Sequence, residues 1–328
     1  MIISKTPLRI SFAGGGSDLE DYYKTGYGAV VSTAIDKHIY VVLNKRFGNS
    51  IRLAYTDFED VQNMSDIRHN LVRESMRLAT ASKGLGGGVS IQYSSELVMA
   101  HEGSGLGASS ALAVGLLNVM NAYLNKRVSP QILARDACRV EIEMLGHPIG
   151  KQDQYSAAFG GLNYIKFKKN GRVEVRPLKC SKRVLAELSS GLLMFYTGLE
   201  SSSQKVLAEQ KSKTPFNLKT IDTMVTLAEK LKLSLEKGNL DNFGSILHEN
   251  WIYKKSLATG VSNAAIERYY NLAMKAGASG GKILGSGGGG FLLFYCDPGK
   301  QSQLRRAMHN LKEIKFGFEN NGSRIIKI

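Results

Sequence analysis

The stretch EGSGLGASSALAVGLL, Glu102 to Leu117, contains three glycines, two adjacent serines and then an unbroken run of small and apolar residues. It lies between a predicted strand and a predicted helix, and the helix is apolar on nearly every face, as expected of a buried helix. The first turn of such a helix presents unpaired backbone N–H groups and the positive end of the helix dipole. Because close-set glycines let a ligand approach the backbone, the stretch predicts a loop that binds an anion, best a phosphate.

Other interpretations of this loop are a tight turn with a serine cap and two familiar nucleotide-binding motifs. A Walker loop is excluded because the chain has no Gly-Lys-Ser/Thr at this point. Gly103, Gly105 and Ala108 fit the G-x-G-x-x-A pattern of dinucleotide-binding proteins, but that fingerprint also needs an acidic residue about 20 positions later. The segment NVMNAYLNKRVSP, residues 118–130, supplies none. The predicted phosphate loop comprises Gly103, Ser104, Gly105, Leu106, Gly107, Ala108, Ser109 and Ser110.

Composition sets the class of protein. The chain has 328 residues, of which 43% are hydrophobic and 22% charged, as is usual for a globular protein with a substantial core. No apolar run reaches the roughly 18 residues that span a bilayer, and charged side chains interrupt the beginning of the chain where a signal peptide would be apolar. The three cysteines are widely spaced, which predicts reduced thiols in a cytoplasmic protein and no zinc site.

The formal net charge of +15 predicts an anionic ligand. Nucleic acid, an acidic membrane and a phosphorylated small molecule are all compatible with it, as is a solvated basic surface. The lysines and arginines are scattered, and they are not interleaved with aromatic residues as in a platform for single strands. No helix-turn-helix or RNA-binding signature is present, so we expect neither nucleic acid nor a membrane as partner.

Strand and helix patterns alternate along the chain. We predict strands over residues 7–13, 29–47, 88–97, 191–198 and 289–296, and a hairpin of 162–167 with 172–178 around Asn170-Gly171. We predict helices over residues 67–84, ending at Gly84, 110–124 and 130–145, the last one capped by Ser129. Three further helical stretches follow residue 198, and a helix and a strand end the chain. The basic segment 179–187 is the predicted domain boundary.

Two further glycine clusters complete a pattern. TPLRISFAGGGSDLEDYY, residues 6–23, has three glycines after a strand, and KILGSGGGGFLLFYC, residues 282–296, has five before a strand. Three glycine-rich loops in this order resemble the GHMP small-molecule kinases, over nearly the whole chain. The resemblance implies an α+β fold with a ribosomal-protein-like N-terminal domain, residues 1–185, and a ferredoxin-like C-terminal domain, residues 186–328. It also implies ATP in the cleft between the domains, with magnesium.

Within that family, the chain looks most like the bacterial sugar 1-kinases. The opening PLRISFAGGGSD, residues 7–18, is similar to that of kinases acting on D-glycero-D-manno-heptose 7-phosphate and, less closely, to that of L-fucose kinases. The resemblance implies transfer of a phosphoryl group to the anomeric O1 hydroxyl, in the synthesis of nucleotide-activated heptose. Another sugar 1-kinase, or a ligand-sensing relative without turnover, remains an alternative. The oligomeric state is left open.

Glu141 is the predicted magnesium ligand. In the helix pattern it shares a face with apolar residues, where a carboxylate is costly unless it is paired or holds a metal. Glu143 points elsewhere and lies one turn from Arg139, as in a surface ion pair. The family places a magnesium-binding glutamate at the position of Glu141, with Ser110 as its partner ligand. A buried ion pair of Glu141 with Arg135 or Lys151 is the alternative.

The predicted catalytic residues are Asp153, Arg9 and Lys151. Asp153 is similar in position to the catalytic aspartate of galactokinase and mevalonate kinase, and it would accept or orient the proton of the attacking hydroxyl. Its alternative role is a helix N-cap. Arg9 matches a family arginine near that base, whereas Lys151 is supported only by its closeness to Asp153.

The predicted sugar-binding residues are Arg9, Gly15, Gly16, Ser17, Asp18, Asp153, Gly287 and Gly288. Carboxylate and hydroxyl groups can bind sugar hydroxyls, and glycines expose backbone amides. An Asx turn at Asp18 and tight loops at the glycines are the alternatives. Lys5, Arg9, Lys37 and Lys282 are candidates for a phosphate already on the substrate, by sequence position alone. Trp251 is predicted to belong to the core.

Overall fold

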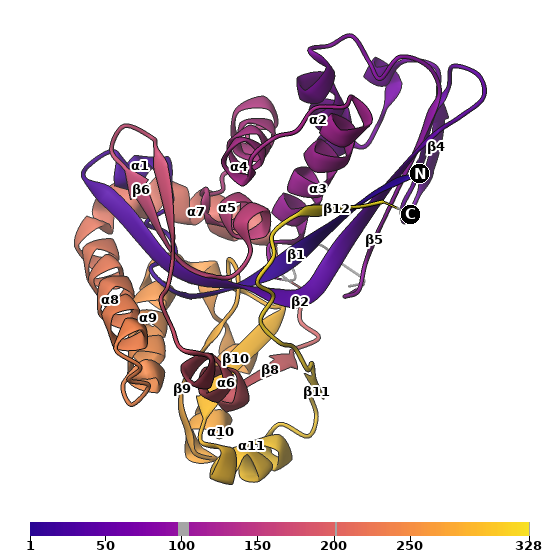
Figure 1. The fold of residues 1–328 in the computed structure, drawn as a ribbon. Helices are drawn as coiled ribbons and strands as arrows, with labels where there is room; N and C mark the ends of the chain where they lie inside the picture. Colours follow the sequence, from indigo (N-terminus) through magenta and orange to yellow (C-terminus); the bar gives the residue numbers. More distant parts are fainter. Residues whose placement is uncertain (98–104, 201, 328) are drawn as a thin grey trace.

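The fold is that of a computed structural model, which describes residues 1–97, 105–200 and 202–327 (Figure 1). Its strands are β1 Ile2–Ala13, β2 Tyr27–Lys45, β3 Ile51–Ala54, β4 Phe58–Val61, β5 Val89–Ser95, β6 Leu162–Lys168, β7 Val173–Pro177, β8 Leu192–Tyr196, β9 Ala278–Ile283, β10 Phe291–Cys296, β11 Lys312–Glu313 and β12 Arg324–Lys327. Its α-helices are α1 Glu20–Tyr23, α2 Asn70–Thr80, α3 Ala108–Tyr123, α4 Pro130–Cys138, α5 Gln152–Phe159, α6 Lys182–Gly191, α7 Ser203–Lys213, α8 Leu218–Glu236, α9 Phe243–Ser256, α10 Ala264–Lys275 and α11 Gln301–Ala307. The predicted mixed α+β architecture is confirmed.

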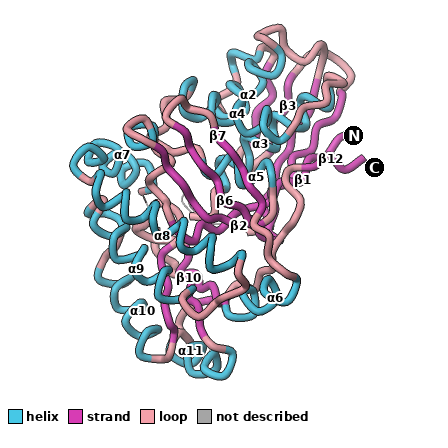
Figure 2. The backbone as a smooth tube through the Cα atoms, turned by 60° about the vertical axis from the view of Figure 1, so that its left-hand side comes forward, coloured by secondary structure: helices cyan, strands magenta, loops and turns pink. Residues whose placement is uncertain are grey.

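The larger sheet has eight strands in the described residues, in the order β12-β1-β2-β5-β3-β4, with β6 and β7 extending from β2. The long strand β2 pairs with β6 through its first half and with β5 through its second half, while β1 runs along its other edge. The last strand, β12, pairs antiparallel with β1, so the two chain ends lie side by side (Figures 1 and 2). The end of the chain therefore returns to the sheet in which the chain begins.

Helices α2, α3, α4 and α5 gather on one side of the larger sheet (Figure 1). The centre of this layer is α3, which is buried on nearly every face because it packs against β1 and β2 as well as against α2, α4 and α5. Helix α4 begins at Pro130 with Ser129 as its predicted cap, the Ser129 side chain accepting from Ile132 N. Helix α8 packs on β1 and β2 too.

The smaller sheet has the order β11-β8-β10-β9 and is antiparallel throughout the described residues. Its central strands are apolar without alternation because both faces are covered. Leu292 and Phe294 of β10 belong to one core cluster, together with the fully buried Trp251. Phe291 and Leu293 face the other cluster, which continues into the larger sheet. The two sheets thus share a core, and Trp251 lies in the core as predicted.

Several details differ from the sequence predictions. Helix α2 ends at Thr80, before Gly84, because Ala81 adopts a left-handed conformation and the Thr80 hydroxyl accepts from Gly84 N at 3.2 Å. Four α-helices, not three, lie between β8 and β9 in the described chain, and Pro215 in a 3₁₀ turn separates α7 from α8. Strands β3, β4 and β9 and helices α1 and α6 were not predicted. The boundary at 185/186 stays a prediction.

Candidate active site

The glycine turn after β1 is held tightly against β2. Gly14 has a φ of +88°, and a Cβ added to it would lie 2.0 Å from the carbonyl oxygen of Ala29, so only glycine fits. The Ser17 hydroxyl, fully buried, donates to the Gly14 carbonyl at 2.7 Å and accepts from Ala29 N at 3.0 Å. Ser17 therefore fixes the turn in this structure, and its hydroxyl is engaged within the protein.

Asp18 joins this turn to the start of α5. Its carboxylate, 3% exposed, accepts from Gly16 N at 3.0 Å and from Gln152 N at 3.2 Å. The bond runs back to Gly16, so it is not the forward Asx turn considered as the alternative. Burial raises the pKa of Asp18, and the nearby charge of Asp153 adds to the effect. A buried carboxylate at this position can accept hydrogen bonds from a polyhydroxylated ligand.

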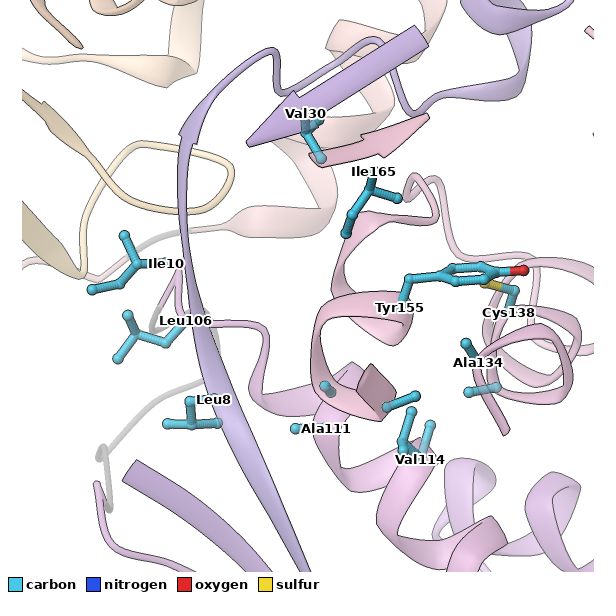
Figure 3. Close-up of a cluster of buried hydrophobic side chains, with 14 of the residues drawn as sticks. Leu8, Ile10, Val30, Leu106, Ala111, Val114, Ala134, Cys138, Tyr155 and Ile165 are labelled. Carbon is cyan, nitrogen blue, oxygen red and sulfur yellow. The ribbon is translucent and has the colours of Figure 1, made fainter. Parts of the chain in front are cut away.

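The described part of the predicted phosphate loop begins at Gly105, because Gly103 and Ser104 lie outside the described residues. Leu106 is buried beside Leu8 and Ile10 of β1 (Figure 3), and its carbonyl accepts from Arg9 N at 3.0 Å. Gly107, with a φ of +74°, precedes α3, and no side chain in the described structure caps that helix start. The N–H groups of the first turn, including those of Ser109 and Ser110, are thus available to an anion.

Arg9 connects the phosphate loop to Asp153. The guanidinium, on a residue only 4% exposed, donates from Nε to Asp153 Oδ1 at 2.7 Å and from Nη2 to Oδ2 at 2.5 Å. Its Nη1 donates to the carbonyl oxygen of Gly105 at 2.6 Å. Gly107 lies against the pair, since a Cβ added there would be 3.3 Å from Asp153 Oδ2. A bidentate pair of this kind fixes the carboxylate geometrically.

Asp153 does not cap its helix. It lies in the first turn of α5, and Lys151 occupies the N-cap position with no side-chain cap bond. The ammonium group of Lys151 lies 3.5 Å from the Gly171 carbonyl oxygen and 4.9 Å from the ring centre of Tyr23. Within the described chain, no ion pair within 4.0 Å joins this ammonium to the Asp153 carboxylate. The structure thus brings Arg9 to Asp153 and turns Lys151 toward the β6–β7 hairpin.

Glu141 is fully buried in a π-helical turn, Arg139–Met144, that continues α4. Its Oε1 accepts from the Ser109 hydroxyl at 2.7 Å and its Oε2 from Gln154 Nε2 at 2.6 Å, and the Ser110 hydroxyl also bonds to it. Burial raises the pKa of Glu141 despite these donors. Glu143 is exposed, with an oxygen 3.9 Å from Arg139 Nε. The two glutamates face apart as predicted.

The surroundings of Glu141 fit a magnesium ion. Its predicted alternative partners are engaged elsewhere, Arg135 with Asp136 at 3.0 Å and Lys151 with Gly171. No cation within 4.0 Å neutralises Glu141 among the described side chains. The described residues contain no cluster of three or more metal-binding side chains, but magnesium usually takes one or two carboxylates together with substrate phosphates. Glu141 and Ser110, beside the open start of α3, provide such hard oxygen ligands.

The third glycine loop closes the site from the side of the smaller sheet. A Cβ on Gly285 would lie 2.2 Å from Cα of Gly105, so these two loops touch backbone to backbone. Gly287 has a φ of +106°, and a Cβ added to it would lie 2.4 Å from the Val261 carbonyl oxygen. The N–H group of Gly288 donates to the same carbonyl at 2.9 Å. Gly287 and Gly288 are therefore constrained by the contact with Val261 at least as much as by any ligand.

Sequence reasoning missed the contribution of α9. Asn250 is fully buried, and its Oδ1 accepts from Gly14 N at 3.0 Å. Lys254, one turn later, is 6% exposed and donates to the carbonyl oxygen of Gly285. The sequence HENWIYKKS, residues 248–256, has the pattern of an ordinary helix. The signal for a role in the site was that two polar residues, Asn250 and Lys254, lie four positions apart on an otherwise buried face.

The predicted binders of a substrate phosphate are not gathered around the site. Lys5 lies over the Tyr40 ring, and Lys37 lies 3.6 Å from Asp36. Lys282 is 2% exposed, and its ammonium donates to the Ser11 carbonyl at 2.7 Å. Of the four predicted candidates, Arg9 bonds to the phosphate loop, through the carbonyl oxygen of Gly105, and it is also bound by Asp153.

Comparison with known proteins adds independent findings. A family model described as the GHMP kinases N terminal domain matches residues 70–161, and one described as GHMP kinases C terminal matches residues 231–313. The chain is 32% identical over 321 residues to D-glycero-alpha-D-manno-heptose 7-phosphate kinase of Campylobacter jejuni, covering 94% of this chain and 93% of that protein. It is 25% identical over 332 residues to the bifunctional fucokinase/GDP-fucose pyrophosphorylase of Arabidopsis thaliana, covering 94% of this chain and 31% of that longer protein.

Among solved structures, a D-glycero-D-manno-heptose 1-phosphate kinase from Bacteroides thetaiotaomicron superposes with a TM-score of 0.83 and 28% sequence identity. The match covers 100% of this chain and 99% of that one. The names of this structure and of the Campylobacter relative agree on a phosphorylated heptose and on a kinase, and they differ in the position of the phosphate.

Proposed function

The chain belongs to the GHMP kinase family, and from that premise we propose that it is an ATP-dependent sugar-phosphate kinase. The proposed acceptor is the anomeric O1 hydroxyl of D-glycero-D-manno-heptose 7-phosphate, and the product is the 1,7-bisphosphate. The observation that carries the proposal is the physical joining of Asp153, through Arg9, to the carbonyl of Gly105 in the phosphate loop. The name of the Campylobacter relative supports the choice of sugar.

The reaction would use Asp153 as the group that accepts or orients the hydroxyl proton. The O1 oxygen forms a bond to the γ-phosphorus of ATP, the bond from that phosphorus to the β-phosphate oxygen breaks, and ADP leaves. An anomeric hydroxyl is more acidic than an ordinary alcohol, so a carboxylate is a sufficient base. Arg9 holds both oxygens of Asp153 in place, and the N–H groups at the start of α3 would bind the phosphates.

Glu141 and Ser110 would hold magnesium, which supplies neutralising charge to the phosphates when it is bound. The carboxylate of Glu141 is oriented for this by Ser109 and by Gln154. Because Ser110, Glu141 and Asp153 are all present, we favour an active enzyme over a ligand sensor that lacks turnover.

A sugar fits the polar lining around the first glycine turn. Three buried polar atoms there have no hydrogen-bond partner within the described chain: Ser11 Oγ, Gln152 Oε1 and Asn250 Nδ2. A Cβ on Gly15 would lie 4.0 Å from that Ser11 oxygen and 3.7 Å from the Gln152 amide nitrogen. Buried polar groups are normally satisfied, and sugar hydroxyls both donate and accept, so a polyhydroxylated ligand would complete this lining together with Asp18.

We place the reaction in the cytoplasm, because the three cysteines of the chain are free and ATP is the proposed phosphoryl donor. No helix in the described residues is both long enough and apolar enough to cross a membrane.

The test is ADP release measured across a panel of sugars and sugar phosphates. We expect kcat/KM for the heptose 7-phosphate to exceed that for the dephosphorylated heptose and for L-fucose by roughly 10²-fold, since a bound distal phosphate contributes a few kcal/mol. Equal turnover of the neutral sugars would exclude the heptose phosphate as the preferred acceptor and leave the kinase intact. If none of the sugars and sugar phosphates in the panel causes release of ADP, both the proposed acceptor and the proposed kinase activity are excluded.

A further inference from the structure

Helix α9 presents a buried cation to the active site. The helix packs against β9, β10 and β1, and it places Asn250 and Lys254 one turn apart on the face that meets the glycine loops. The Asn250 amide bonds to Gly14, and the Lys254 ammonium donates to the carbonyl oxygen of Gly285. The first and third glycine loops are therefore both contacted by this helix.

Lys254 has no anionic partner of its own. Among the described residues no carboxylate oxygen lies within 4.0 Å of its ammonium, and its hydrogen bond goes to a neutral carbonyl. The charged groups that face it are Arg9 from β1, Asp18 from the first glycine turn, Asp153 from α5 and Lys282 from β9. Asp153 is already bound by Arg9, and Asp18 by Gly16 and Gln152. Burying a cation without a paired anion costs free energy, so the chain retains a positive charge that lacks a counterion.

The position of this charge relative to the phosphate loop is defined. Gly285, whose carbonyl receives the Lys254 hydrogen bond, touches Gly105 backbone to backbone. The carbonyl of Gly105 receives a hydrogen bond from Arg9, which binds Asp153. The ammonium of Lys254 thus lies at the junction of the third glycine loop, the phosphate loop and the predicted base.

We propose, on the basis of the proposed kinase function, that Lys254 is a catalytic residue whose ammonium binds the γ-phosphoryl group of ATP while that group passes to the sugar. As the O1–phosphorus bond forms and the bond to the β-phosphate oxygen breaks, negative charge stays on the three non-bridging oxygens. Lys254 donates a hydrogen bond to one of them and keeps its proton, and the sugar proton goes to Asp153. Lysine suits this role because it acts as a point charge on a moving group.

Burial, and after it the positive charge of Arg9, lower the pKa of Lys254 to about 8, although the negative charges of Asp18 and Asp153 oppose this shift. The ammonium is therefore charged at neutral pH and loses its proton as the pH rises through about 8. A bound phosphoryl group would raise this pKa, because an anion stabilises the charged form.

The main test compares Lys254→Met with Lys255→Met. Lys255 is the next residue on α9, but it pairs with Glu267 at 2.9 Å and faces away from the glycine loops. We expect Lys254→Met to lower kcat at least 10²-fold, which is the usual effect of removing one hydrogen-bond donor to a transition state. The KM for ATP should change less than about fivefold. Lys255→Met should keep kcat within about twofold. Equal kcat in wild type and Lys254→Met would overturn the proposal.

Thermal unfolding separates catalysis from a structural role. Met fills the space of the lysine stem and removes the uncompensated charge, so we expect Lys254→Met to unfold at the same or a higher temperature than wild type. A fall in the unfolding temperature that accompanies the loss of kcat would show that Lys254 serves the fold, and would overturn the proposal.

The pH profile provides a second readout. Wild-type kcat/KM for ATP, which reports the free enzyme, should fall above about pH 8, as Lys254 loses its proton. Lys254→Arg, which stays charged, should lose this alkaline fall even if its overall rate is lower. An unchanged alkaline limb in the arginine variant would assign the titration to another group and count against Lys254.

Two binding and kinetic measurements identify which phosphate is bound. Lys254→Met should lose the same factor in kcat with heptose 7-phosphate and with the neutral heptose; a loss confined to the phosphorylated sugar would mean that Lys254 binds the phosphate of the substrate. If no sugar is turned over by wild type, the proposed acceptor fails but this inference is still tested by nucleotide binding. Lys254→Met should then weaken the binding of AMP-PNP about threefold more than that of ADP, and equal weakening would overturn the inference.

Discussion

Asp153 and Glu141 are two carboxylates of one site with opposite surroundings. Asp153 is bound by a guanidinium through both oxygens, at 2.7 and 2.5 Å. Glu141 is more deeply buried, yet it receives only neutral donors, two serine hydroxyls and one amide. A carboxylate with a dedicated cation is fixed in position, whereas one with neutral donors keeps its negative charge for another cation. These surroundings are the reason why we propose that Asp153 orients the sugar hydroxyl and that Glu141 binds the metal ion.

The same difference should appear in stability. Neutralising Asp153 leaves a buried arginine without its counterion, and such a change is destabilising. Neutralising Glu141 removes a buried charge that no cation compensates. The free energy of unfolding should therefore stay nearly the same or increase. The two substitutions should therefore both lower kcat but differ in their effect on stability.

The largest effect is expected for Asp153→Asn. We predict that kcat falls by roughly 10²–10⁴-fold, the range for a missing general base, while ATP binding stays nearly intact. The free energy of unfolding should fall by about 2 kcal/mol, because Arg9 loses one charged partner. Steady-state ADP release, nucleotide titration and urea unfolding measure the three quantities.

The control for that variant is Asp136→Asn, which removes an aspartate that pairs with Arg135 on the exposed surface of α4. It should change neither kcat nor stability by more than a small amount, as is usual for surface pairs. Normal turnover in a folded Asp153→Asn protein would remove Asp153 from the chemistry and leave it as the anchor of Arg9.

Glu141→Gln should have the second largest effect. We predict a loss of roughly 10²–10³-fold in kcat at low magnesium, partly recovered at high magnesium, because one oxygen ligand loses its charge. Stability should be unchanged or higher. Glu143→Gln, on the exposed side of the same turn, is the matched control and should behave like wild type. Opposite results for the two glutamates would refute the assignment of the metal site.

Much of this site could be predicted from the sequence because its loops are local. Glycine clusters next to apolar strands and helices define their own positions, and the burial of Glu141 against the exposure of Glu143 followed from helical spacing. The π-helical turn that carries them was not foreseen, because a single inserted residue leaves no mark on the apolar pattern.

The rest depends on tertiary contacts. Strand β9, ASGGKI, contains glycines that usually argue against a strand, but a Cβ on Gly280 would lie 1.8 Å from the carbonyl oxygen of Gly244 in α9. Close packing of helix on strand requires glycine there. That packing also brings Lys254 to Gly285, and it buries Lys282 against the carbonyls of β1. No spacing within α9 reveals which strand it will meet.

The smallest predicted effect separates two adjacent serines beside Glu141. Ser109 donates to Glu141 at 2.7 Å and only orients it, whereas Ser110 is the predicted ligand of the metal ion. Ser110→Ala should therefore weaken apparent magnesium affinity about 10- to 100-fold, while Ser109→Ala should cost about 1 kcal/mol, or roughly fivefold, for one lost hydrogen bond. Magnesium titrations of ADP release in both variants give the comparison directly. Each substitution removes one hydroxyl group from the first turn of α3. If Ser109→Ala proves the more damaging, the ligand is Ser109, and Ser110 is the residue that orients Glu141.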